Sequence, residues 1–344
     1  MNTPLSDNPD HIRHLCARLD IGSQRGELCR VYGGFHHKMW RLETHCGSYA
    51  IKQLSADTDV NRPDINKHYN VTEAIAEEFS GHGVSAIYAL SRDACYLQRV
   101  DNIGYLVYPW TNALAIGKND ICERHAHEVA RVLARMHRVN LVNPALEDAP
   151  ADSHSEEKAV LLVQRAVECN IRNAPLLKEH LPTFLGIISA QQAAVHTLEK
   201  HRVISHGDLD HKNVLWGDSG TPIIIDWESV RRMNPTHELL LEALDWSGIT
   251  STFQHGLFET FISSYSEAGG ELEGSSIQAC FDCILGDWLN WLLYNVGRAV
   301  DLEDEEQHSI GTEQVDLSLS TLLRLRHLMP QLLAIARSES ASHV

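Results

Sequence analysis

The sequence lacks the features that mark membrane proteins and nucleic-acid-binding proteins. None of its apolar runs approaches the roughly 18 residues that a membrane-spanning helix needs, and no signal peptide is recognisable. A block of basic residues is also missing, and the formal net charge is −17 over 344 residues. Because an acidic surface repels nucleic acids and anionic membranes, we expect neither as a partner. These absences predict a cytoplasmic protein.

Several common catalytic and metal-binding patterns are absent as well. The eight cysteines are irregularly spaced, which indicates free thiols in a reducing compartment. Cys280 and Cys283 form a C-x-x-C without the second pair that a zinc site needs, so we expect them in the core. His127-Glu128 begins a zinc-protease motif, but Arg131 stands where its second histidine belongs. Since no G-x-S-x-G elbow appears either, a serine hydrolase is not expected.

The richest chemical pattern in the chain lies between residues 203 and 228. Short β-branched runs at 203–204, 214–216 and 223–225 predict buried strands joined by tight turns. Asp208, Asn213 and Asp226 then stand on loops or at strand ends. One carboxylate can accept the proton of an attacking hydroxyl, while the amide and the second carboxylate are hard oxygen ligands for Mg²⁺. The pattern therefore predicts a phosphoryl-transfer centre.

This segment resembles the signature of the aminoglycoside phosphotransferase and choline kinase family. The resemblance rests on the run from His206 to Leu209 (H-G-D-L), on Asn213, and on the run from Ile225 to Glu228 (I-D-W-E). H-G-D stands where protein kinases have H-R-D, and D-W stands where they have D-F-G. The resemblance implies that Asp208 is the catalytic carboxylate, that Asn213 and Asp226 bind magnesium, and that ATP or GTP supplies the phosphate. We expect His206 to brace the loop by hydrogen bonding.

The resemblance also implies a fold. It is a bilobal α+β, protein-kinase-like fold, and the length of the chain agrees with two lobes. We expect residues 1–108 to form a nucleotide-binding lobe around an antiparallel β-sheet. Residues 109–344 are then a helical lobe that carries the catalytic and acceptor sites.

The N-terminal lobe contains a predicted phosphate-binding region. Gly33 and Gly34 lie in a loop between two predicted strands, where backbone N–H groups can approach phosphates closely. Tyr49-Ala50-Ile51-Lys52 is similar to the kinase V-A-I-K strand, which aims Lys52 at the α- and β-phosphates. In kinase-like folds a helical glutamate pairs with this lysine. Glu73 is our first choice and Glu77 the alternative, while a capping box with Asn70 is a competing role for Glu73.

The connection between the predicted lobes carries two aromatic residues. Tyr108 and Trp110 end a predicted strand, at the position where this family binds the nucleotide base through its hinge. Both rings could cover an adenine, and burial in the core is an equally good interpretation.

Periodicity predicts the remaining elements. Helices are expected at 11–19, 64–82, 120–140, 156–172, 183–200, 236–247, 253–267, 275–300 and 315–337. Strands are expected at 29–32, 38–42, 49–54, 86–90, 94–100 and 105–110. The acidic stretch 301–314 is expected to be a solvated loop.

We expect the acceptor to be a small molecule with a hydroxyl group, since the lack of an activation segment after Asp226 favours it over the alternative, a protein substrate. Carboxylates beside indoles on the C-terminal helices suit an aminoglycoside or another cationic polyol, and the alternative is that the tryptophans are core and the acids solvated. Choline-like, sugar and nucleoside acceptors remain open, as does a non-catalytic nucleotide-binding regulator. Glu238 is expected to hold the loop rather than to react. The predicted acceptor residues are Glu242, Asp245, Asp287 and Trp291.

Overall fold

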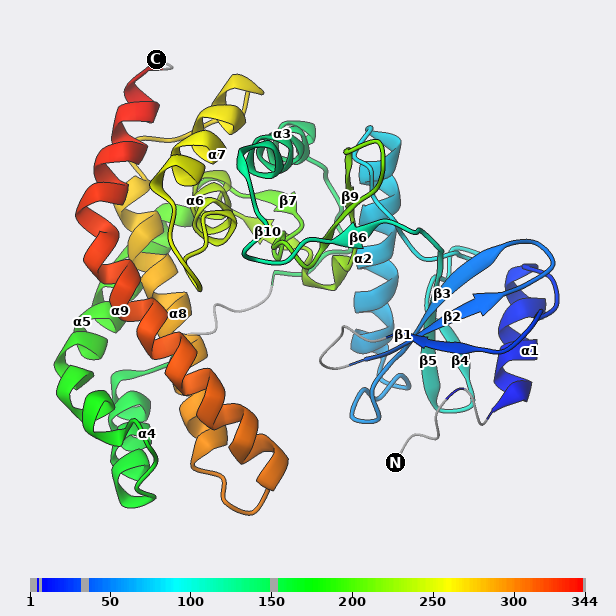
Figure 1. The fold of residues 1–344 in the computed structure, drawn as a ribbon, viewed down its shortest axis with the longest axis horizontal. Helices are drawn as coiled ribbons and strands as arrows, with labels where there is room; N and C mark the ends of the chain where they lie inside the picture. Colours follow the sequence, from blue (N-terminus) through cyan, green and yellow to red (C-terminus); the bar gives the residue numbers. More distant parts are fainter. Residues whose placement is uncertain (1–4, 6–7, 32–36, 149–153, 343–344) are drawn as a thin grey trace. The chain divides into compact units, whose positions relative to one another are not determined.

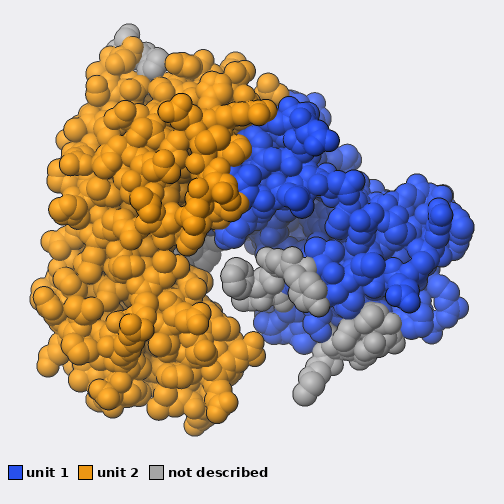
Figure 2. All heavy atoms as spheres, in the orientation of Figure 1, with its two compact units in different colours: residues 1–116, 142–147, 212–231 blue, residues 117–141, 148–211, 232–344 orange. Residues whose placement is uncertain are grey.

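The computed structural model describes residues 5, 8–31, 37–148 and 154–342. The chain divides into two compact units, coloured separately in Figure 2. Unit 1 comprises residues 1–116, 142–147 and 212–231, and unit 2 comprises residues 117–141, 148–211 and 232–344. The predicted boundary at 108/109 lies close to the end of the first segment of unit 1. Sequence reasoning did not foresee that the chain returns to this unit twice.

Unit 1 is built on a five-stranded antiparallel sheet in the order β1-β2-β3-β5-β4 (Figure 1). Its register pairs Lys52 with Met39 on one side and with Leu106 on the other, so that Lys52 lies on the central strand. The strands are β1 (Cys29–Val31), β2 (Lys38–Glu43), β3 (Ser48–Gln53), β4 (Gln98–Val100) and β5 (Ile103–Pro109).

Helix α1 (Pro9–Leu19) packs on this sheet through an apolar face. Its Ile12 and Leu15 join Trp40 and Ile51 of the sheet in one buried cluster. A polar contact fixes the packing, since Nδ1 of His11 lies 2.8 Å from the hydroxyl of Tyr105 on β5. The predicted leading helix and the first three strands are therefore confirmed.

Helix α2 (Pro63–Gly81) and a small sheet complete unit 1. The small sheet has the order β6-β8-β9, with β6 (Leu114–Ala115), β8 (Val214–Trp216) and β9 (Pro222–Ile224). The predicted strand at 86–90 is wrong. The backbone groups of Ser85 and Ile87 form hydrogen bonds with Ile224 of β9, but this pairing is an isolated bridge at Ala86 and not a strand. The predicted strand at 94–100 shortens to β4.

Unit 2 is mainly helical. Helix α8 packs against α5 and α9, and α3 packs against α7. Strands β7 (Val203–Ser205) and β10 (Arg231–Met233) form a two-stranded sheet. The helices are α3 (Glu123–Val139), α4 (Glu156–Glu168), α5 (Ala174–Leu198), α6 (Pro235–Trp246), α7 (His255–Glu267), α8 (Ile277–Ala299) and α9 (Glu305–Ser342).

Two helices of unit 2 differ from the prediction. Helix α5 begins at Ala174 rather than 183 and continues through Pro182. Helix α9 begins at Glu305, so most of the stretch expected to be an acidic loop is helical. Glu305 and Glu306 occupy its first turn, where negative side chains interact favourably with the helix dipole. Among the described residues, no helix has the length and hydropathy to cross a membrane.

Candidate functional site

Lys52 is a buried ammonium group held by two carboxylates within unit 1. Its Nζ donates to Asp226 Oδ1 at 2.8 Å and to Glu228 Oε2 at 2.7 Å. The lysine is 7% exposed. Burial alone would lower the pKa of Lys52, but the charges of the two carboxylates hold it above its ordinary value. Lys52 therefore stays charged.

The predicted partner of Lys52 makes other contacts. Glu73 accepts hydrogen bonds from the backbone N–H of Ala89 and from the hydroxyl of Tyr108, both at 2.7 Å. Burial raises the pKa of Glu73 to about 7, against the opposing effect of these hydrogen bonds. The expected pair of Lys52 with Glu73 is thus replaced by pairs with Asp226 and Glu228. The alternative, Glu77, accepts a hydrogen bond from the hydroxyl of Tyr96 instead.

The capping-box interpretation of Asn70 and Glu73 is also wrong. Helix α2 begins at Pro63, so Asn70 lies in its interior. The side-chain oxygen of Asn70 accepts hydrogen bonds from the backbone N–H groups of Tyr96 and Leu97, at 2.7 and 3.2 Å. Asn70 therefore connects α2 to the chain before β4 and does not cap the N-terminus of the helix.

Asn213 and Asp226 are brought together by the β8–β9 ladder in unit 1. Val214 pairs with Ile224, and one residue further the backbone N–H of Ile225 donates to the carbonyl oxygen of Asn213 at 3.0 Å. Asp226 follows directly in a left-handed conformation, with φ 63°. An L residue adopts this conformation at a cost in free energy, which a functional position commonly carries.

Trp227 anchors the segment that carries Asp226 and Glu228. Its ring is 1% exposed and stacks on Phe79 of α2, with ring centroids 5.5 Å apart. Because Trp227 is buried between them in sequence, the two flanking carboxylates are fixed relative to α2. This packing explains why an aromatic residue follows Asp226.

The H-G-D turn lies in unit 2 and directly follows β7. Gly207 has φ 78°, a left-handed conformation that favours glycine. The backbone N–H of Asp208 donates to Nδ1 of His206 at 3.3 Å, and His206 itself is fully buried. The side chain of Asp208 is exposed. His206 thus supports the turn, and Asp208 is accessible from solvent.

Helix α6 holds this turn along one face. Glu238 Oε1 accepts a hydrogen bond from the N–H of Gly207 at 3.0 Å, and Glu242 Oε1 accepts one from the N–H of Leu209 at 3.0 Å. One turn later, Trp246 Nε1 donates to the carbonyl oxygen of Leu209 at 2.9 Å. The spacing of four residues places all three side chains on one helix face. Helix α6 therefore sets the backbone position of the loop around Asp208.

Glu238 also connects the loop to α3 and α7. Its Oε2 lies 2.8 Å from Nε2 of His137, whose Nδ1 lies 2.7 Å from the hydroxyl of Tyr265. Burial opposes ionisation, but the hydrogen bond and charge of His137 lower the pKa of Glu238 to about 2. The carboxylate is therefore ionised and fully engaged, which confirms the expected structural role.

Comparisons with known proteins decide which family this arrangement belongs to. The model of the phosphotransferase enzyme family matches residues 27–274, which is more than half of the chain. The chain belongs to the phosphotransferase enzyme family. The matched range contains Lys52, the H-G-D turn and the D-W-E segment. The predicted family and phosphotransferase activity are therefore confirmed, and a search of curated proteins found no match to the chain.

Solved structures of small-molecule phosphotransferases share the fold. Spectinomycin phosphotransferase APH(9)-Ia, in complex with ADP and spectinomycin, is 13% identical with a TM-score of 0.64, covering 96% of this chain and 97% of that one. Choline kinase from Streptococcus pneumoniae is 15% identical with a TM-score of 0.58, covering 92% and 99%. Ethanolamine kinase from Plasmodium vivax is 15% identical with a TM-score of 0.54, covering 91% and 83%. The predicted kinase-like α+β fold is confirmed.

Within this phosphotransferase, the predicted hinge residues have contacts of their own. The Tyr108 hydroxyl donates to Glu73, as described above. Trp110 has one ring face covered by Arg41, whose guanidinium carbon lies 4.7 Å from the ring centroid. Base binding by these two residues stays a prediction. Gly33 and Gly34 lie outside the described residues.

The four predicted acceptor residues differ in exposure. Glu242 is only 3% exposed and bonded to Leu209, so we replace its expected acceptor contact with a positioning role. Burial, and then the charge of Asp245, raise the pKa of Glu242 well above its ordinary value. Asp287 and Trp291 on α8 are exposed, and Trp291 stacks on Tyr294 with ring centroids 5.5 Å apart.

Asp245 belongs to a cluster that sequence reasoning missed in part. Its Oδ2 lies 3.4 Å from Nδ1 of His211. Asp210, His211 and Asp245 bring one ligand-type atom each within 4.8 Å of one another. Asp210 and His211 stand directly after the H-G-D-L run, so their position in the motif was the available signal.

Proposed function

We propose that this phosphotransferase transfers the γ-phosphate of ATP or GTP to a hydroxyl group of a small cationic molecule. The observation that carries the proposal is the 2.8 Å contact between Lys52 Nζ and Asp226 Oδ1. It joins two residues 174 positions apart, each of which was assigned to the nucleotide site from its own motif. The ADP bound in the spectinomycin phosphotransferase supports nucleotide use.

The residues present fit a magnesium ion. Asn213 and Asp226 offer an amide oxygen and a carboxylate from neighbouring strand ends, and hard oxygen donors are the ligands that Mg²⁺ prefers. The Asp226 side chain is 38% exposed, which leaves its carboxylate accessible from solvent. When bound, the ion would offset the negative charge of the nucleotide phosphates.

The protein's own groups perform the remaining steps. The Lys52 ammonium offsets charge on the phosphates, and its burial strengthens this interaction. Asp208 orients the acceptor hydroxyl and takes its proton as the oxygen–phosphorus bond forms and the bond to the leaving nucleoside diphosphate breaks. Positioning by the α6 contacts supplies much of the rate, because phosphoryl transfer depends chiefly on orientation and charge stabilisation.

Charge on the surface of unit 2 favours a cationic acceptor. Asp210 and Asp245 lie close together, and Asp287 and Trp291 are exposed on α8. Carboxylates bind ammonium groups, and an exposed indole binds cations through its ring face. The spectinomycin phosphotransferase and the choline kinase of the same fold support an acceptor of this class.

A nucleotide-consumption screen tests the proposal. Purified protein is incubated with ATP or GTP and Mg²⁺ against amino sugars, neutral sugars, choline-like alcohols and nucleosides. Acceptor-dependent release of nucleoside diphosphate, absent in Asp208→Asn, is the expected result. Tight nucleotide binding without transfer to any acceptor would instead indicate a non-catalytic regulator.

A further inference from the structure

Two carboxylates contact Lys52, and they differ in whether they are also predicted to bind magnesium. Asp226 is a predicted magnesium ligand, so its oxygens are shared between the ion and Lys52. Glu228 has no metal-binding role in the proposed function. Its Oε2 accepts from Lys52 Nζ at 2.7 Å, a distance equivalent to the 2.8 Å contact of Asp226. Glu73 is occupied by Ala89 and Tyr108. Glu228 is therefore the carboxylate that can hold Lys52 throughout.

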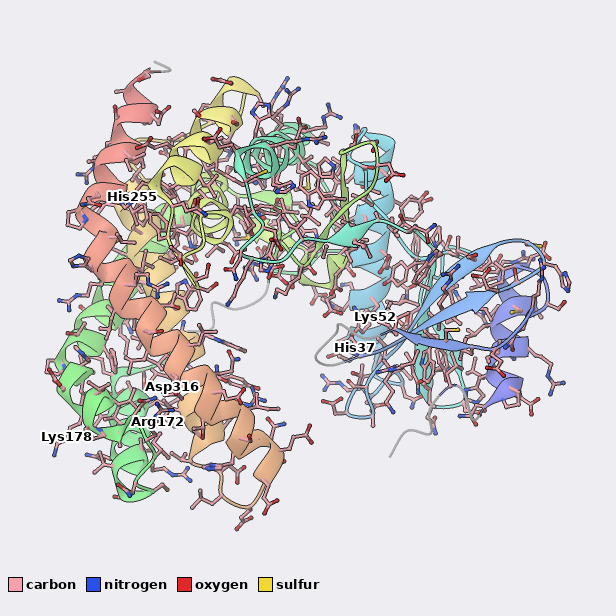
Figure 3. All side chains as sticks on the ribbon, in the orientation of Figure 1. His37, Lys52, Arg172, Lys178, His255 and Asp316 are labelled. Atoms are coloured by element: carbon pink, nitrogen blue, oxygen red, sulfur yellow. The ribbon has the colours of Figure 1, made fainter. Side chains whose placement is uncertain are left out.

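His37 lies near the same oxygen of Glu228. Its Nε2 lies 3.6 Å from Glu228 Oε2 and 3.4 Å from the hydroxyl of Tyr69. The imidazole is 11% exposed, so water competes little for this contact. His37 and Lys52, both labelled in Figure 3, thus converge on one carboxylate.

The proton on His37 can be placed from the geometry. The backbone N–H of Ser55 donates to Nδ1 of His37 at 3.1 Å. A backbone amide can only donate, so Nδ1 carries a lone pair and the proton of the neutral imidazole is on Nε2. That proton faces Tyr69 and Glu228. Ser55 follows β3, which carries Lys52, so the same strand orients both the lysine and the histidine.

We propose that Glu228, oriented by His37, is the residue that positions Lys52 for the nucleotide phosphates. This inference rests on the proposed function. It assigns to Glu228 the role that kinase-like folds give to a helical glutamate. His37 and Glu228 are positioning residues, since both act through Lys52. In this arrangement the Ser55 N–H donates to His37 Nδ1, and the Nε2–H of His37 faces Glu228. Glu228 in turn accepts a hydrogen bond from Lys52.

Two substitutions of His37 separate this role from a merely structural one. In His37→Asn the amide oxygen can replace Nδ1 as acceptor for Ser55 N–H, but no donor reaches Glu228. In His37→Gln the longer amide can place an N–H near the position of Nε2. We expect His37→Asn and Glu228→Gln to weaken the binding of ADP with Mg²⁺ by about tenfold, the loss of one charge-assisted contact. His37→Gln should stay within about threefold of wild type.

Binding of ADP with Mg²⁺, measured by titration calorimetry, is the first readout. Glu78→Gln is the matched control, because Glu78 is exposed on the same helix as Glu73 and should bind as wild type. Steady-state kinetics are the second readout: KM for the nucleotide should rise, and KM for the acceptor should not. Thermal melting identifies a variant that fails to fold; if a His37 variant does, the double-mutant cycle below, which contains no change at His37, decides.

A cycle of Lys52→Met with Glu228→Gln compares the two candidate partners. Losses that are less than additive for this pair, and additive for Lys52→Met with Glu73→Gln, support Glu228. Coupling to Glu73 alone would overturn the proposal, as would wild-type ADP affinity in both Glu228→Gln and His37→Asn. If the wild-type protein binds no nucleotide, the proposed function fails too; if it binds and the variants match it, only this inference fails.

Discussion

The carboxylate of Glu238 accepts a hydrogen bond from the backbone N–H of Gly207, a residue 31 positions earlier, at 3.0 Å. Gly207 precedes the predicted catalytic residue Asp208. The other oxygen of Glu238 contacts His137, so one buried side chain joins α6, α3 and the catalytic turn. These two contacts of Glu238 link the packing of unit 2 to the position of the predicted catalytic residue.

We therefore expect Glu238→Ala to destabilise the protein more than an ordinary surface change. The substitution leaves the Gly207 N–H and the His137 ring nitrogen buried without their acceptor, and each such group costs about 1–3 kcal/mol. The midpoint of urea denaturation, followed by tryptophan fluorescence, should fall accordingly. Glu179→Ala, at an exposed position on α5, is the control and should change little. Equal effects of both substitutions would contradict the structural role of Glu238.

The two predicted carboxylates of the reaction should have separable effects. Asp208→Asn removes the proton acceptor and keeps the shape, so turnover should be lost while the affinity for ADP with Mg²⁺ stays near wild type. Asp226→Ala removes a predicted metal ligand and one partner of Lys52, so Mg²⁺-dependent nucleotide binding should be lost. Calorimetry and a coupled ADP assay measure the two effects. Near wild-type turnover in Asp208→Asn would remove the assignment of that residue.

The buried carboxyl group of Glu73 should make the stability of the protein depend on pH. Its pKa is about 7 in the folded protein, where burial raises it from its ordinary value of 4.5. The folded state therefore binds the proton more tightly than the unfolded state between these values. As the pH rises from 4.5 to 7 the contribution of Glu73 to stability falls, and above pH 7 its cost is on the order of 3 kcal/mol.

Glu73→Gln removes this ionisation and can keep both contacts, with the amide oxygen accepting from the Ala89 N–H and the NH2 group donating to the Tyr108 hydroxyl. Relative to wild type, the variant should gain stability between pH 5 and pH 8, by up to about 3 kcal/mol. Urea denaturation at several pH values measures the difference. A difference that does not change with pH would show that Glu73 ionises normally in the folded state.

The sequence predicted local features well and long-range pairing poorly. Strand β3 and the turn at Asp208 follow from patterns within a few residues, which determine local backbone structure. The partner of Lys52 does not follow from such patterns. Glu73 and Glu228 both stand at positions in the sequence where a partner of Lys52 could lie, and only tertiary geometry distinguishes them. The contact of Glu238 with His137 joins residues 101 positions apart, and no local pattern indicates it.

The errors in the helices have a physical cause as well. Proline removes one backbone hydrogen bond of a helix, and the predicted helix began at 183, directly after Pro182. The packing of α5 against α8 compensates for that loss, and the helix continues through the proline. At 305–314 the acidic composition indicated a loop, but two glutamates in the first turn suit a helix N-terminus. Composition alone could not distinguish these cases.

Asp245 and Asp287 are the predicted acceptor residues whose substitution should change KM for the acceptor. Asp245 is partly exposed beside His211, and Asp287 is exposed on α8, where it accepts a hydrogen bond from Gln191 at 3.2 Å. If these carboxylates bind an ammonium group of the acceptor, Asp245→Asn and Asp287→Asn should each raise KM for a cationic acceptor by about threefold to tenfold. KM for the nucleotide should not change, because neither residue belongs to unit 1.

Salt and a matched control make this prediction specific. Attraction between exposed charges is screened at higher ionic strength, so the wild-type advantage should shrink between about 0.05 and 0.5 M salt. Glu259→Gln, at an exposed position on α7, removes the same charge from unit 2 and should leave KM unchanged. A general effect of net charge would instead appear in all three variants. If a neutral or anionic acceptor reacts best, and the two aspartate variants show no defect, the acceptor is not held by its positive charge, and the assignment of Asp208 and Lys52 is unaffected.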